Sequence, residues 1–382
     1  MSAVRAALSI TTVNSRDASA LDLNEMTRAL FEEGWDTRVF AEFFGGTAGP
    51  GPHHSRYVED FVNASEDLFI LHYAQKCPLG LKQLKRLRCR RVLRFHNVTP
   101  PALFGALDPH VALDCQKSLE EMGREFRFLD SVLFLPASEF SRRDLLAVGV
   151  PESRCEVVPV FHDLERLVSA NEDVALSRRM SGDGVPNIVT VGRLTPHKGQ
   201  HRMIEAMRIL DESRKGGCRL WIAGGGDRGE AYRKQLEGMI ERWGLEGCVK
   251  LMGSVSNAQL ATLYRRADLF ALASSHEGFC VPLVEAMAHG VPSVVLDAGA
   301  LAETQGDTGE LLESGDPSRI AEAIRGLLDD PFRRETLGKA CLRRYSEKFA
   351  EDRVRARFMG LVGQISEFHP AKSKALHAAP GP

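Results

Sequence analysis

Two short stretches carry the charged residues whose types and spacing could do chemistry. The first, VGRLTPHKG (191–199), places Arg193 and Lys198 directly after an apolar run that is typical of a buried strand. An arginine fork and a lysine point charge at the end of a strand could hold a diphosphate, and they would stabilise the negative charge of such a leaving group. Taken alone, the stretch is equally typical of an ordinary basic loop, so its interpretation depends on the second stretch.

The second stretch, SSHEGFCVPLVEAMAHGVP (274–292), predicts a short helix that follows a loop. We expect Pro282 to occupy the first helical position, because its ring is set for a helix and it lacks an N–H group that would be unpaired there. Gly290 predicts the end of the helix. The unpaired N–H groups at such a helix start, from about Cys280 to Val284, and the helix dipole would favour an anion.

Two glutamates lie on either side of this helix start. Glu277 precedes it in the loop and Glu285 lies one turn inside the helix. Beside an anion, both carboxylates need hydroxyl groups from which to accept hydrogen bonds, and a sugar nucleotide has hydroxyls on both sides of its diphosphate. The alternative is that both are solvated surface acids. We favour the ligand site, because the glutamates, Pro282 and the helix start occur together.

Parallel sheets must position these residues, because short apolar runs alternate with amphipathic helical patterns along the whole chain. We expect strands at 6–13, 36–41, 67–73, 91–96, 131–136, 155–160, 187–192, 219–223, 249–252, 268–273 and 293–296. The longer expected helices span about 110–128, 230–242, 257–266 with Asn257 as N-cap, and 350–367. This alternation predicts an α/β protein of two doubly wound domains, with ligands bound beyond the carboxyl ends of the strands, in a cleft between the domains.

A chain of 382 residues is long for one hydrophobic core, which also favours two domains. We expect an N-terminal domain at 1–160, a C-terminal domain at 161–348, a last helix at 349–368 that returns to the N-terminal domain, and a disordered tail at 369–382. The net charge of −2 gives no argument for a nucleic-acid partner, and we expect none. The eight scattered cysteines and the lack of an apolar leader favour a reduced, cytoplasmic protein without structural zinc.

These residues resemble the family 4 glycosyltransferases, also called glycosyltransferase group 1, of GT-B fold, over nearly the whole chain. The resemblance rests on Gly192-Arg-Leu with Lys198-Gly199, on AGGGD (223–227), and on Glu277 followed eight residues later by Glu285 in EAMAHGVP (285–292). It implies two Rossmann-like domains and transfer of a sugar with retention of configuration, without a metal ion or other cofactor.

The same resemblance implies a role for each residue of the donor site. Arg193 and Lys198 would bind the diphosphate, Glu285 the ribose, and Glu277 the hydroxyls of the sugar. Main-chain amides from Gly278 to Val281 would hold the sugar and phosphate. The implied donor-binding set is Gly192, Gly278, Phe279, Cys280, Val281, Leu283 and Glu285.

In the N-terminal half, RFHNVTPP (94–101) looks like the His-Asn-Ile-Thr-Pro signature of one subgroup, many of whose members build bacterial surface polysaccharides. The subgroup implies that His96 faces the donor sugar as a catalytic residue. His72 also ends a predicted strand, and we expect it to be structural. The chain departs from the family in two places: no clear glycine occurs in the loop TTVNSRDASA (11–20), and Cys280 replaces the more usual glycine after Phe279.

One segment carries many basic residues. Residues 68–107 have no acidic side chain and contain Lys76, Lys82, Lys85, Arg86, Arg88, Arg90, Arg91 and Arg94. Leu79, Leu81, Leu84 and Leu87 lie between them. A helix packed on the core with a solvated basic back is slightly favoured over a surface that docks on anionic lipid or on a lipid-linked acceptor.

The sequence therefore predicts a retaining, metal-independent hexosyltransferase. It would use a GDP- or UDP-linked donor, with mannose as one candidate sugar, and a glycan or lipid-linked acceptor in bacterial surface polysaccharide biosynthesis. We expect it in the cytoplasm, with peripheral contact at the inner face of the membrane as one option. The alternatives are a catalytically inactive GT-B scaffold and another GT-B enzyme such as a nucleotide-sugar epimerase.

Overall fold

Two compact units make up the chain. The computed structural model describes residues 4–14, 18–45, 52–104, 108–213, 217–225 and 230–365, and the tail predicted at 369–382 lies outside them. Unit 1 contains residues up to Thr99, Leu113–Asp163 and the chain from Glu351 on, and unit 2 contains Pro100–Ala112 and Leu164–Ala350.

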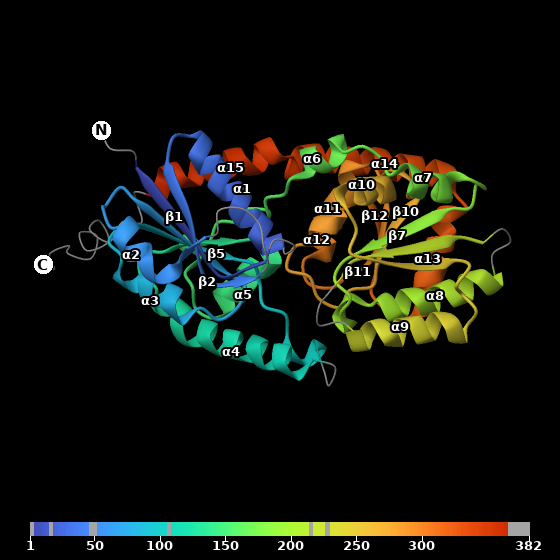
Figure 1. Cartoon of the computed structure of the whole chain (residues 1–382), viewed down its shortest axis with the longest axis horizontal. Coiled ribbons are helices and arrows are strands. Elements are labelled where there is room, and N and C mark those ends of the chain that lie inside the picture. The colour runs from blue at the N-terminus through green and yellow to red at the C-terminus, as the bar shows by residue number, and fades with distance from the viewer. Residues whose placement is uncertain are drawn as a thin grey trace, which may run out of the picture. The chain divides into compact units, whose positions relative to one another are not determined.

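Unit 1 is built on a parallel sheet of six strands in the order β3-β2-β1-β4-β5-β6 (Figure 1). The strands are β1 (Arg5–Asn14), β2 (Asp36–Gly45), β3 (His53–His54), β4 (Leu68–Tyr73), β5 (Arg90–Phe95) and β6 (Leu133–Pro136). The helices are α1 (Ala18–Glu32), α2 (Val58–Phe61), α3 (Pro78–Arg86), α4 (Pro109–Glu125), which begins within the unit 2 segment, α5 (Glu139–Ala147) and α15 (Glu351–Gln364).

Side chains alternate between the two faces of this sheet and bury both. Ala6, Leu8 and Ile10 of β1 lie in one cluster with α1 and α15, which includes Phe358. The intervening Ala7 belongs to a second cluster with α3 and α4. Because both faces are covered, the strands are apolar throughout, as in other parallel sheets. The strands predicted from short apolar runs are therefore confirmed for β1, β2, β4, β5 and β6.

Unit 2 repeats the scheme with a second parallel sheet in the order β12-β11-β10-β7-β8-β9. The strands are β7 (Asn187–Val191), β8 (Arg219–Ala223), β9 (Val249–Gly253), β10 (Leu269–Leu272), β11 (Ser293–Leu296) and β12 (Gly309–Leu312). The helices are α6 (Leu164–Ser169), α7 (Val174–Ser181), α8 (Gln200–Ser213), α9 (Glu230–Arg242), α10 (Asn257–Arg265), α11 (Val281–Ala288), α12 (Leu301–Gln305), α13 (Pro317–Leu328) and α14 (Pro331–Arg344). The helices α8, α9 and α13 cover one face, and α7 and α10 pack on the other.

The structure corrects two expectations about local structure. The strand predicted at 155–160 does not form, and Cys155 makes only an isolated bridge to Phe134 of β6. The segment donates to β6 from Glu156 and Val158, but Pro159 has no N–H group and cannot extend the ladder. The N-cap of α10 is Ser256 rather than Asn257, because Ser256 and Gln259 form a reciprocal capping box.

The basic segment of unit 1 turns its leucines inward. Leu81, Leu84 and Leu87 lie in the core under α3, and Arg91 is buried and donates to main-chain carbonyls. Lys85 forms an ion pair with Glu125.

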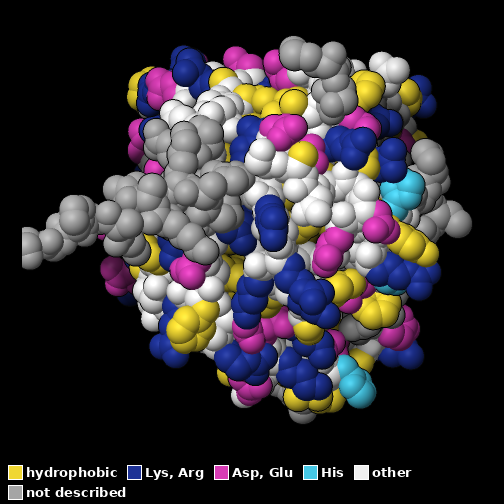
Figure 2. Space-filling view, turned by 90° about the vertical axis from the view of Figure 1, so that its left-hand side faces the viewer, with side chains coloured by type: hydrophobic (Ala, Val, Ile, Leu, Met, Phe, Trp, Pro, Cys, Tyr) yellow, Lys and Arg dark blue, Asp and Glu magenta, His cyan; other side chains and the backbone are white. Residues whose placement is uncertain are grey.

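The exposed positive charge of this segment lies on the outer side of α3 and just beyond its end. Lys82, Arg86 and Arg88 are exposed and make no ion pair within the described part of the chain. Figure 2 shows Lys and Arg side chains gathered on one face of the molecule, with acidic side chains between them. Among the described residues, no helix has the length and apolar character needed to cross a bilayer.

Candidate functional site

The loops after β7 and β10 are fastened together at the carboxyl edge of the unit 2 sheet. The two strands are parallel neighbours, with Ile188 aligned to Leu269. The Ser275 N–H donates to the carbonyl of His197 at 2.7 Å. Gly199 is left-handed, with φ +71°, and a Cβ there would overlap the carbonyl of Ala273. Only glycine permits this close approach, so the glycine predicted from the motif has a structural cause.

Lys198 and Glu277 meet across these two loops. The Nζ atom of Lys198 lies 2.6 Å from Oε1 of Glu277, and the side chains are 17% and 8% exposed. Arg193, from the same loop as Lys198, is exposed, and its carbonyl accepts a hydrogen bond from Gln200. The sequence therefore predicted residues that come into contact although 79 positions separate them.

The turn between β11 and α12 fixes the main chain of Glu277. Ala300 N–H donates to the Glu277 carbonyl at 2.8 Å. Gly299, with φ +66°, lies so close that a Cβ would overlap this carbonyl and lie 2.9 Å from the Glu277 nitrogen. The position of Glu277 therefore depends on the loop after β7 and on the turn between β11 and α12, as well as on its own loop.

The start of α11 has an unusual backbone. Cys280 is the N-cap residue and is left-handed, with φ +83° and ψ +74°, a conformation that costs an L-residue about 1 kcal/mol or more. This conformation gives a physical reason for the glycine that is usual at this position in the resembled family. Burial raises the pKa of the Cys280 thiol well above its ordinary value. The thiol is thus a small buried group rather than a thiolate nucleophile.

The helix itself begins one residue earlier than expected. α11 spans Val281–Ala288, so Pro282 is its second residue. Gly290 has φ +68° just beyond the helix and is the predicted stop. The N–H groups of Leu283 and Val284 already donate to the Cys280 carbonyl, at 3.2 and 3.4 Å.

Phe279 anchors the loop in front of the helix. Its carbonyl accepts from Thr304 Oγ1 at 2.8 Å, and its ring packs edge-on against Phe349. Gly192 lies at the end of β7, where its N–H donates to Ala223 and Gly224 packs against its carbonyl. Every donor-site residue predicted in the C-terminal half therefore lies in loops or helix starts at one edge of one sheet.

Glu285 is held by a residue that the sequence did not point to. Its Oε2 accepts a hydrogen bond from the hydroxyl of Tyr264 in α10, at 2.7 Å. Burial raises the pKa of Glu285 to about 7, and the hydrogen bond from Tyr264 opposes this rise. Tyr264 could have been noticed as an aromatic residue within the helix predicted at 257–266, but the sequence does not show that its partner is Glu285.

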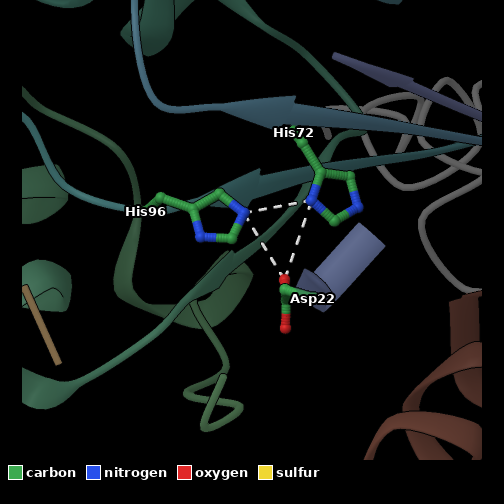
Figure 3. Close-up of side chains that lie close together, drawn as sticks. All are labelled: Asp22, His72 and His96. Atoms are coloured by element: carbon green, nitrogen blue, oxygen red, sulfur yellow. Dashed lines mark hydrogen bonds and ion pairs between the residues drawn. The ribbon is translucent and has the colours of Figure 1, made fainter. Parts of the chain in front are cut away.

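Unit 1 contains a separate polar cluster of Asp22, His72 and His96 (Figure 3). His96 directly follows β5, and its Nε2 lies 3.0 Å from Nδ1 of His72 in β4. Asp22 Oδ2 lies 3.4 Å from His96 Nε2 and 3.7 Å from His72 Nδ1. His72, expected to be structural, is thus a direct partner of His96, and Asp22 was missed. A signal for Asp22 was its place on the face of α1 that also carries the buried Met26.

The charges of this cluster are set by Arg94. Its Nε donates to Asp22 Oδ2 at 2.8 Å and its Nη2 donates to Oδ1 at 3.1 Å. Burial alone would raise the pKa of Asp22, but Arg94 and the two histidines bring it below its ordinary value. Burial lowers the pKa of His96 to about 4 and that of His72 well below its ordinary value, so both rings are neutral at pH 7.

The three side chains have the composition of a metal site, and their ligand atoms lie within 4.8 Å of one another. However, the guanidinium group of Arg94 already pairs with both oxygens of Asp22. A divalent cation at this position would lie against that positive charge, which disfavours it. The cluster fits a neutral hydrogen-bonded network better than a metal centre.

Comparisons with known proteins agree with this geometry. Residues 179–344, which carry Arg193, Lys198, Glu277 and Glu285, match the model of the family described as glycosyl transferases group 1. The chain is 32% identical over 226 residues to D-inositol 3-phosphate glycosyltransferase of Kineococcus radiotolerans, a match that covers 54% of this chain and 51% of the relative. It is 30% identical over 271 residues to the amylovoran biosynthesis glycosyltransferase AmsK of Erwinia amylovora, covering 68% of this chain and 60% of AmsK. The chain thus spans about half the length of the curated relatives it matches.

Among solved structures, Anabaena Alr3699/HepE in complex with UDP and glucose is similar over 94% of this chain and 99% of its own, with a TM-score of 0.71 and 19% identity. The two parallel six-stranded sheets and this likeness confirm the predicted fold class. The chain therefore has the GT-B fold, and the part of it that carries the four charged residues of the unit 2 site matches the group 1 glycosyl transferases.

Proposed function

We propose that the chain is a retaining hexosyltransferase that moves a hexose from a nucleotide sugar to a glycan or lipid-linked saccharide. The observation that carries this proposal is the fastening of two loops in unit 2, which brings Lys198, Glu277 and the start of α11 together, with Glu285 one turn inside the helix. A cation, two carboxylates and a helix N-terminus in one place suit a ligand that carries a diphosphate between two hydroxyl-bearing rings.

Each residue has a role in this proposal. Arg193 and Lys198 bind the diphosphate, Glu285 accepts from the ribose, and Glu277 accepts from sugar hydroxyls once the diphosphate competes for Lys198. Main-chain amides in 278–281 complete the site. The further donor-binding residues are Gly192, Gly278, Phe279, Cys280, Val281 and Leu283.

For the reaction, we propose that the acceptor hydroxyl attacks the anomeric carbon of the donor sugar on the face that the leaving phosphate occupies, while the bond from that carbon to the phosphate oxygen breaks. The phosphate assists by accepting the proton of the acceptor hydroxyl. Arg193 and Lys198 stabilise the negative charge of the phosphate, so they supply the positive charge that a metal ion would otherwise provide. His96 is the catalytic candidate of unit 1, because its ring is the partly exposed member of a buried neutral network. A neutral imidazole ring can donate a hydrogen bond to a substrate hydroxyl or accept one from it.

The donor is proposed to be linked to UDP or GDP. The similar Alr3699/HepE structure is a complex with UDP and glucose, and AmsK is named an amylovoran biosynthesis glycosyltransferase. We propose a place in the synthesis of a bacterial surface polysaccharide, with mannose as one candidate sugar. We also propose a cytoplasmic location with peripheral contact between the exposed basic side of α3 and anionic lipid.

A thermal-shift panel of UDP, GDP and ADP, followed by UDP-glucose and GDP-mannose, tests the donor site. We expect one base to raise the melting temperature, with a larger rise for its sugar nucleotide. The Glu285→Ala variant should lose this rise and all transfer while keeping its fold. If none of the nucleotides binds, or if the purified variant transfers sugar at a near-normal rate, the proposed function is wrong. Binding without transfer to any acceptor would point to the inactive scaffold.

A further inference from the structure

Tyr264 is a buried residue whose hydroxyl ends at the carboxyl group of Glu285. The hydroxyl lies 2.7 Å from Glu285 Oε2 and 3.2 Å from the carbonyl of Pro282. Glu285 Oε1 accepts no hydrogen bond from the described residues. We propose that Tyr264 is a positioning residue, which orients the Glu285 carboxylate so that its remaining acceptor sites receive the ribose hydroxyls of a nucleotide. This inference rests on the proposed function and assigns a role that no motif carried.

The ring that carries this hydroxyl is itself held in place. Tyr264 is fully buried in α10, beside α11 (Figure 1), and it stacks on His289 with ring centroids 5.3 Å apart and an angle of 23° between the planes. His289 Nδ1 lies 2.8 Å from the Glu285 carbonyl and must donate to it, because a carbonyl only accepts. The tyrosine therefore cannot move without disturbing the helix that carries Glu285, and a fixed donor is what orients a flexible glutamate.

The same contact controls the protonation of Glu285. Burial raises the pKa of its carboxyl to about 7, and the Tyr264 hydrogen bond acts in the opposite direction. Ribose hydroxyls donate to the ionised carboxylate, so nucleotide binding strengthens as pH rises through this pKa. Loss of the tyrosine hydroxyl removes a hydrogen bond to the ionised form, and the pKa of Glu285 rises further. Binding at neutral pH then weakens, whereas binding at higher pH recovers.

Other ionisable groups surround α11, but none makes a hydrogen bond or ion pair with the Glu285 carboxyl within the described chain. They are Cys280 and His289 at the two ends of α11, Arg265 on α10, Glu165 and Arg166 on α6, Glu303 on α12, Arg333, Arg334, Glu335, Lys339, Arg343 and Arg344 on α14, and Tyr345, Glu347 and Lys348 in the helical turn that follows α14. Burial and Tyr264 are the causes of the shifted pKa. The tyrosine is therefore the group to change.

The experiment compares Tyr264→Phe with wild type and with Tyr232→Phe. Tyr232 is the control, because it is buried in the same unit and its hydroxyl bonds His201 rather than the Glu285 carboxyl. Titration calorimetry measures the affinity for UDP-glucose and for GDP-mannose from about pH 6 to about pH 8.5, a range in which the diphosphates of both probes stay fully ionised. We expect Y264F to bind about tenfold more weakly than wild type below pH 7 and to approach wild type at the upper end, since a hydrogen bond to a charged group corresponds to about one pKa unit.

The outcomes separate this inference from the proposed function. If wild type binds neither probe, the proposed function fails. If wild type binds one probe and Glu285→Gln weakens that binding, but Y264F has the wild-type pH profile, the proposed function stands and the role of Tyr264 is overturned. An equal weakening at every pH, together with a melting temperature lowered as much as in Y232F, would also overturn it, because it would mean that the hydroxyl only stabilises the fold. A profile displaced to higher pH in Y264F alone is the expected result.

Discussion

The contact between Lys198 and Glu277 joins stability to ligand binding at a single pair of residues. Both side chains are mostly buried, and Nζ and Oε1 are 2.6 Å apart. We expect Lys198→Ala to lower the free energy of unfolding by about 2 kcal/mol, because it leaves a largely buried carboxylate without its counter-charge. Adding Glu277→Gln should restore part of this loss, because the uncompensated charge is then gone. Both variants should lose nucleotide-sugar binding. Chemical denaturation measures the stability of each variant, and calorimetry measures its binding.

The pair between Lys339 and Glu335 provides the control for this cycle. It lies in the same unit, on α14, with both side chains mostly exposed. Lys339→Ala should change stability by less than about 0.5 kcal/mol, because water and salt screen exposed ion pairs, and it should leave donor affinity unchanged. If K198A were as stable as K339A and bound donor normally, Lys198 would have neither role.

At the scale of the element, the turn between β11 and α12 acts as a support for the loop that carries Glu277. Gly299 occupies the left-handed region, and a Cβ there would overlap the Glu277 carbonyl. Gly299→Ala should therefore destabilise the protein by more than about 2 kcal/mol, since strain and steric overlap add. It should also weaken donor binding, because relief of the overlap displaces Glu277. Thermal unfolding and calorimetry measure the two effects.

Gly247 serves as the matched position for this substitution. A Cβ there would meet no atom within 4 Å, and its backbone lies outside the left-handed region. Gly247→Ala is expected to be close to neutral in both measurements. If G299A behaved like G247A, the turn would not support the site.

Local sequence patterns predicted most helices and strands of the site, but they could not predict contacts between residues that lie far apart in the chain. Pro282 and Gly290 bounded α11 to within one residue, because proline and glycine act through their own backbone preferences. The strand expected at 155–160 failed, because Pro159 lacks the N–H group that would extend the ladder with β6. Asp22 and Tyr264 escaped notice, because their partners lie 72 and 21 positions away and no spacing rule links them.

At the scale of the whole molecule, the positive and negative charges nearly cancel, so a membrane contact must come from a local surface. Lys82 and Arg86 on the outer side of α3, with Arg88 just beyond the end of the helix, provide such a surface, whereas Leu81 and Leu84 are buried in the core. No apolar stripe is left to enter the lipid from this helix. Any binding is therefore electrostatic, and electrostatic attraction to anionic lipid amounts to about 1 kcal/mol for each basic residue near the surface.

Vesicle sedimentation tests this surface. We expect wild-type protein to sediment with phosphatidylglycerol-containing vesicles at about 50 mM salt and to be released at about 0.5 M salt, because the screening length shortens several-fold. Replacing Lys82, Arg86 and Arg88 together by alanine should abolish the binding. The control variant has alanine at Lys234, Arg319 and Lys339, which are exposed in unit 2. It loses the same charge and should bind as wild type does. Failure of the wild type to sediment at low salt would refute the membrane contact. Binding that resists salt would require apolar insertion, which the buried leucines of α3 oppose.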